Sequence, residues 1–110
     1  MGRTRLFIIF GAVIVVMAVF FSFMFMNERA RVRDALRLRD MRQIEQHYQQ
    51  TYLATGSFRQ TQFPDVNDPG GFSYVARQPT DTTFSVSFRL ERTHDRLRAG
   101  DHTLTERGIE

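Results

Sequence analysis

The chain has 110 residues, a formal net charge of +3 and no cysteine, and all 15 of its basic residues are arginine. This composition excludes disulfides, thiolate metal sites and a cysteine nucleophile, and the net charge is too small to indicate nucleic-acid binding by itself. Residues 28–110, which follow a long apolar run, can form one small domain at most.

The apolar run extends from Leu6 to Met26 and contains no charged residue. Its 21 residues would form a helix of about 31 Å, enough to cross a bilayer core of about 30 Å. A cleavable signal peptide has a shorter apolar core and small residues at its exit, whereas this run ends in Phe25-Met26-Asn27-Glu28. After a short basic N-terminus over residues 1–5, the sequence predicts a retained transmembrane helix over residues 6–26. We therefore expect a single-pass protein of the cytoplasmic membrane, with the lipid bilayer as its first partner.

The helical pattern continues beyond this run, from Glu28 to about Ala54, without an intervening glycine or proline. Apolar side chains recur every three or four residues along one face: Val32, Ala35, Leu38, Met41, Ile44, Tyr48 and Tyr52. Gly56 ends the pattern, because glycine suits the left-handed position after a last helical turn. We expect one continuous helix from about residue 4 to 54, whose extramembrane part lies within residues 27–56.

The sequence pattern over residues 57–110 predicts a loop followed by an antiparallel sheet. Turn-forming residues are dense over 57–71. Thr83 to Glu91 alternates between two faces, and its apolar face consists of Phe84, Val86, Phe88 and Leu90. A shorter strand is expected over 72–76 and a third at about 102–106.

The predicted fold class is therefore α+β, with a long N-terminal helix packed on a small three-stranded antiparallel sheet. The helical stripe over residues 38–52 is expected to cover the apolar face of the strand at 83–91. We also expect a set of aromatic side chains to form the core: Phe58, Phe63, Phe72, Tyr74, Phe84 and Phe88.

Arginines are concentrated just after the apolar run, at Arg29, Arg31, Arg33, Arg37, Arg39 and Arg42. One interpretation is contact with anionic lipid headgroups or with an acidic face of a partner, at about 1 kcal/mol per basic residue near a membrane surface. The alternative is a solvated helix face, because Glu28 and Asp34 lie at i,i+3 spacing from arginines. The segment has no aromatic residue to stack on a base, which argues against nucleic acid as a partner.

The sequence contains no catalytic or cofactor-binding motif, so we predict neither an enzyme nor a small-molecule substrate. Three histidines lack the spacing of metal ligands: His47, His94 and His102. Asp65, Asn67 and Asp68 offer oxygen ligands for calcium, but such residues are also ordinary components of turns. We therefore predict no metal site.

The end of the long helix carries a series of short motifs: Arg33-Asp34, Arg37, Asp40-Met41-Arg42-Gln43-Ile44, Tyr48 and Thr55-Gly56-Ser57-Phe58. This series resembles the Arg-Asp…Asp-x-Arg-Gln-Ile…Tyr…Asn-Gly-x-Tyr run of type IV pilins and type II secretion pseudopilins. Small pilin-like domains place their sheet where this chain has Phe72-Ser73-Tyr74, Phe84-Ser85-Val86, Arg89-Leu90-Glu91 and Gly108-Ile109. The resemblance implies a structural subunit of a type II secretion or type IV pilus-type assembly. Its implied partners are other pilin-like subunits or a membrane platform protein.

The family pattern is incomplete at the N-terminus. Processed pilins have Gly followed by Phe or Met at the cleavage site, and a Glu five residues into the mature chain that is thought to pair with a neighbour's terminal amine. Here Gly2 is followed by Arg3, and no acidic residue precedes Glu28. The alternative is therefore a single-pass membrane protein whose pilin-like C-terminal domain docks to another envelope component without polymerising.

Two arguments about orientation disagree. The positive-inside rule compares Arg3 and Arg5 before the apolar run with six arginines between residues 29 and 42, and it favours a cytoplasmic C-terminal domain. The family resemblance implies the reverse. We expect the orientation of the family, with the C-terminal domain outside the cytoplasm.

Overall fold

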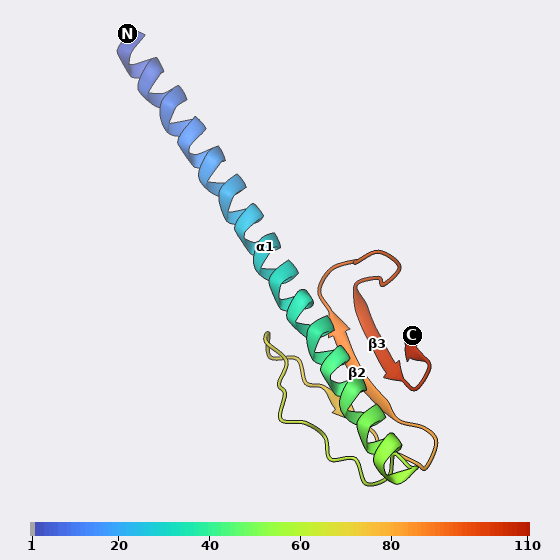
Figure 1. Cartoon of the computed structure of the whole chain (residues 1–110). Helices are drawn as coiled ribbons and strands as arrows, with labels where there is room; N and C mark the ends of the chain where they lie inside the picture. The colour runs from blue at the N-terminus through green and yellow to red at the C-terminus, as the bar shows by residue number, and fades with distance from the viewer. Residues whose placement is uncertain (1) are drawn as a thin grey trace. The chain divides into compact units, whose positions relative to one another are not determined.

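The computed structural model describes residues 2–110 and contains one long helix and a four-stranded antiparallel sheet (Figure 1). The helix, α1, spans Gly2–Thr55. It ends where Gly56 adopts a φ of 75° and donates its N–H to the Tyr52 carbonyl at 2.7 Å. The predicted α+β class and the continuous helix are confirmed. The chain divides into two compact units, one that ends at Ala30 and one that comprises Arg31–Glu110, which we call the head.

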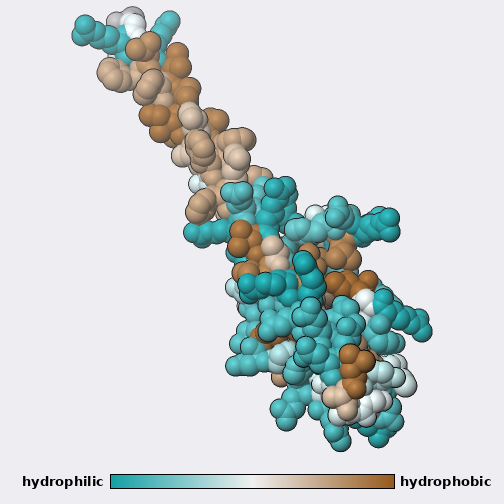
Figure 2. Space-filling view, viewed as in Figure 1, coloured by the Kyte–Doolittle hydropathy of each residue, from teal (hydrophilic) through white to brown (hydrophobic). Residues whose placement is uncertain are grey.

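The first unit is the apolar part of α1. Its large apolar side chains between Leu6 and Met26 are 51–74% exposed, and Figure 2 shows this segment as a largely apolar surface. By length and composition, α1 qualifies as a membrane-crossing helix, and none of its most apolar stretch is buried within the described structure.

The sheet of the head contains β1 (Val75–Ala76), β2 (Ser85–Leu90), β3 (Gly100–Thr105) and β4 (Gly108–Ile109), in that spatial order. All neighbouring strands are antiparallel. The first predicted strand is thus shorter than expected, and there is one strand more than predicted. The extra strand forms because a tight turn after Thr105, with Gly108 at a φ of 112°, returns the chain to pair with β3.

The core of the head lies between α1 and the apolar face of β2. All four predicted apolar residues of that face are 3% exposed or less. The Tyr48 ring of α1 stacks on the Phe84 ring, with 4.3 Å between centroids and an angle of 5° between planes. The buried apolar side chains are Met41, Ile44, Tyr48, Phe58, Phe84, Val86, Phe88, Leu90 and Leu104. The predicted packing of the helix stripe on this strand is therefore confirmed in its central part.

The core is smaller than predicted at its edges. Phe63 and Phe72, which we expected inside, are each 36% exposed, and Val32 in the predicted stripe is 58% exposed. The buried face of α1 instead continues from Met41 to two polar residues, Arg37 and Asp34. These positions also recur every three or four residues, so they lie on the same face of the helix as the core.

Candidate functional site: buried ion pairs on the arginine-rich helix

Polar side chains from three parts of the head meet on the buried face of α1. We call this group the ion-pair cluster, and it consists of Arg33, Asp34, Arg37, Asp68, Glu91 and His94. Three of these residues come from α1, one from the loop before β1, and two from the connection between β2 and β3. The cluster therefore joins segments that are far apart in the sequence.

Arg37 lies at the centre of the cluster and has no exposed surface. Its Nη1 donates to Asp34 Oδ1 and Glu91 Oε2, both at 2.8 Å. Its Nε and Nη2 donate to the two carboxylate oxygens of Asp68 at 2.5 and 3.0 Å. The hydrogen bonds to Asp68 raise the pKa of Arg37 further above its ordinary value, despite the opposing effect of burial, and those to Glu91 and Asp34 add to this. The planar guanidinium suits such forked pairing, which an ammonium group would not reproduce.

Asp34 binds the end of β2 to the helix. Its two carboxylate oxygens accept the backbone N–H groups of Glu91 and Arg92, each at 2.9 Å. Its Oδ2 also lies 2.8 Å from His94 Nε2. Burial alone raises the pKa of Asp34, but the hydrogen bonds from Glu91, His94, Arg37 and Arg92 reverse this effect, so the pKa is lowered. The carboxylate thus stays charged while it satisfies backbone donors that the sheet leaves unpaired.

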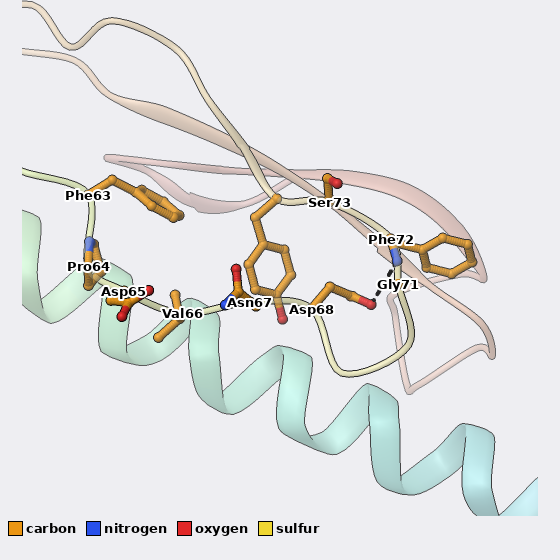
Figure 3. Close-up of a pocket in the computed structure, with 10 residues that line it drawn as sticks. Phe63, Pro64, Asp65, Val66, Asn67, Asp68, Gly71, Phe72 and Ser73 are labelled. Atoms are coloured by element: carbon orange, nitrogen blue, oxygen red, sulfur yellow. Dashed lines mark hydrogen bonds between the residues drawn. The ribbon is translucent and has the colours of Figure 1, made fainter.

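Asp68 holds the loop before β1 against the helix. Its Oδ2 accepts the N–H groups of Gly70 at 2.8 Å and Phe72 at 3.1 Å, and Figure 3 shows the second bond. Burial raises the pKa of Asp68, but hydrogen bonds from Arg37 and these amides lower it overall. A Cβ added at Gly70 would lie 2.5 Å from Arg37 Nη2, so the loop approaches the guanidinium as closely as only glycine allows.

The same loop surrounds an open hollow of about 550 Å³, lined by residues that include Phe63, Asp65, Asn67 and Tyr74 (Figure 3). Asp68 is not available as a calcium ligand in this loop, because both of its carboxylate oxygens contact Arg37. Within residues 2–110, no group of three or more His, Asp or Glu side chains is placed to hold a metal ion.

A second polar contact ties this loop to α1. The Tyr74 hydroxyl donates to Asp40 Oδ2 at 2.9 Å. Burial, followed by this hydrogen bond to a carboxylate, raises the pKa of Tyr74 well above its ordinary value, so the hydroxyl remains a donor.

The six arginines that we considered as a membrane or partner surface fall into two groups. Arg37 is excluded from such a surface, because it is completely buried. Arg33 is half-buried and forms a forked pair with Glu91, with its Nε at 2.7 Å from Oε2 and its Nη2 at 2.8 Å from Oε1. The hydrogen bond to Glu91 raises the pKa of Arg33 and, in turn, lowers that of Glu91. The exposed group is Arg29, Arg31, Arg39 and Arg42.

The sequence indicated only one contact of the cluster, the i,i+3 pair of Asp34 and Arg37. Its other members, Asp68, Glu91 and His94, carry no local signal, because their partners on α1 are between 31 and 60 residues away. His94 and His102 lie in separate surroundings. His94 joins the cluster, whereas the ring of His102 contacts backbone carbonyls of Arg98 and Glu110.

No protein-family model, curated protein or solved structure matches this chain. Evidence about its function therefore comes from its own residues.

Proposed function

We propose that this protein is a membrane-anchored, pilin- or pseudopilin-like structural subunit of a type II secretion or type IV pilus-type assembly. The main support is where the motif residues of the resemblance lie in the fold. Asp34 and Arg37 bind the β2–β3 connection and the loop before β1, Asp40 binds Tyr74, and Tyr48 stacks on Phe84. If the similarity in sequence arose by chance, its residues would not be expected to coincide with the helix residues that attach the sheet.

The apolar part of α1 supports the anchoring role. Its side chains between Leu6 and Met26 are exposed along the whole segment, and no described residue covers them. Apolar surface of this extent is unfavourable in water at roughly 25 cal/mol per Å². Lipid tails, or similar helices of other pilin-like subunits or of a membrane platform protein, would remove it from water. We place the anchor in the cytoplasmic membrane and the head outside the cytoplasm.

In a second candidate function, the protein has the same anchor and head but does not polymerise. No carboxylate is present between Gly2 and Asn27 to pair with a neighbour's terminal amine inside the membrane, and Gly2 is followed by Arg3. This observation favours a single-pass protein whose head binds another envelope component as one copy. Both candidates share the anchor and the fold of the head, and they differ in what contacts the apolar helix.

Crosslinking within the anchor distinguishes the two candidates. Because the chain has no cysteine, single-cysteine variants such as Val13→Cys and Val16→Cys report on one position each. In native membranes, a ladder of self-adducts after oxidation would support a polymerising subunit, and one heterologous adduct would support the second candidate. The matched control is Arg77→Cys, an exposed position on the head that should give no ladder through the anchor. Release of the protein from membranes by carbonate extraction would refute both.

A further inference from the structure

The connection between β2 and β3 forms a tight turn that exposes arginines. His94 and Leu97 exchange two backbone hydrogen bonds, N–H to carbonyl in both directions, each at 2.8 Å. Asp95, the first of the two residues between them, has a φ of 51°, a conformation that aspartate tolerates better than most residues. Arg96 follows at the tip and Arg98 lies just beyond, and both are exposed.

This turn is fixed to the helix rather than loosely attached. The His94 ring contacts Asp34, and Leu97 packs against the core beside Leu38, another partly buried residue. Asp34 also holds the backbone of the residues that lead into the turn. The arginines are thus presented from a defined position on the head.

The register of the head places the turn at one particular end. Phe84, at the start of β2, lies against Tyr48, whereas Glu91, just after β2, is bound by Asp34. β2 therefore runs antiparallel to α1, and the β2–β3 connection lies at the Arg31 end of the head (Figure 1). Asp34 follows Met26 by eight residues, which is about 12 Å of α-helix.

The charges at this end are unbalanced. Within residues 2–110, the guanidinium groups of Arg31, Arg96 and Arg98 form no ion pair, and all three side chains are exposed. The turn contains one acid, Asp95. Electrostatic attraction extends about 10 Å at moderate salt. In the sequence, only residues 27–30 separate the apolar run from the head.

From this arrangement we infer that the 94–98 turn is a second membrane contact, in which Arg96 and Arg98, together with Arg31, bind the headgroups of anionic phospholipids. The inference rests on the proposed membrane anchor and adds a contact of the head with the lipid surface. It adds two arginines from a segment far away in the chain to the exposed arginines of the helix that the sequence suggested. Two arginines near an anionic surface should shift the equilibrium towards the bound head by about 30-fold.

Lipid-dependent quenching in nanodiscs tests this contact on the full chain. A fluorophore is attached through Ala99→Cys, an exposed position next to the turn, in a chain that has no other cysteine. The nanodiscs contain phosphatidylcholine with or without phosphatidylglycerol, and a trace lipid carries a nitroxide quencher on its headgroup. We expect strong quenching only when phosphatidylglycerol is present, and we expect the double variant Arg96→Gln with Arg98→Gln to lose it.

The control double variant is Arg77→Gln with Arg107→Gln. It removes the same charge from the opposite end of the sheet, because Arg77 N–H bonds to Ser85 and Arg107 lies in the turn that joins Thr105 to Gly108. Quenching should persist in this control and in Arg96→Lys with Arg98→Lys. Equal quenching in both lipids, or equal loss in the two glutamine variants, would overturn the inference while leaving the anchor intact. Failure of the chain to enter nanodiscs would overturn the proposed function and this inference together.

Discussion

Replacing Arg37 by methionine should destabilise the head strongly, because it keeps much of the side chain's length but removes four hydrogen bonds to carboxylates. Asp34 and Asp68 are fully buried at their side chains and would lose their cationic partner. Removing one partner of a buried ion pair costs about 3–5 kcal/mol. Both acids keep backbone hydrogen bonds, so we expect the lower end, about 3 kcal/mol. A domain of this size has about 4–12 kcal/mol in total, so the loss is a large part of its stability.

Pulse proteolysis of the full chain in detergent micelles across a urea series measures this free energy of unfolding. Arg42→Met is the matched control, since Arg42 is an exposed arginine of the same helix that forms no ion pair within residues 2–110. It should change stability by less than about 0.5 kcal/mol. Combining Arg37→Met with Asp68→Asn should cost less than the sum of the single changes, because the second change removes the stranded charge. If Arg37→Met costs no more than Arg42→Met, the cluster does not hold the head together as described.

Three further outcomes are expected. Phe88→Ala should cost about 3–5 kcal/mol in the same assay, because Phe88 is 2% exposed, whereas Phe63→Ala, at a ring 36% exposed, should cost clearly less; equal costs would contradict the assigned core. Stability should fall with acidification, because the three carboxylates of the cluster have lowered pKa values in the folded head. Their contribution to the free energy of unfolding is complete above their ordinary pKa values of 3.8 and 4.5 and is lost as the pH falls from there through the lowered values. Proteolysis that is unchanged between pH 5 and 3 would contradict this expectation. A reporter active only in an oxidising compartment, fused after Glu110, should be active, and activity of a cytoplasmic reporter at that position instead would invert the orientation.

The sequence predicted the central part of the fold well. In β2 the apolar and polar residues alternate without interruption, so the inward positions of Val86 and Phe88 follow directly from the two-residue period of a strand. The helix and its end at Gly56 were equally clear, because no glycine or proline lies between Gly11 and Gly56. The residue pattern did not predict β4, since two residues carry no measurable alternation, although the family resemblance included Gly108-Ile109 in the sheet.

The ion-pair cluster lay beyond prediction because polar residues on a helix are expected to face water. Arg37 is buried only because Asp68 and Glu91, distant in sequence, converge on it. The prediction that Phe72 lies in the core likewise overlooked partners that are distant in sequence. Its half-exposed ring lies under the guanidinium groups of Arg37 and Arg89, at 5.0 and 5.1 Å, so an aromatic residue serves here as a cation–π partner.

Asp34 and Arg37 leave the ribosome long before the residues that will pair with them. Glu91 follows Asp34 by 57 residues, which corresponds to roughly 3–11 s of synthesis. Throughout that interval the helix carries a carboxylate and a guanidinium among the apolar residues of its future core face. Each costs about 2.5–3.5 kcal/mol at the centre of an inserting helix. If the apolar run inserts as proposed, these two charges would add to those of Glu28, Arg29 and Arg31 in keeping the amphipathic segment out of the bilayer. The residues that later attach the sheet would thus also help, during biogenesis, to keep the helix beyond the proposed anchor outside the membrane.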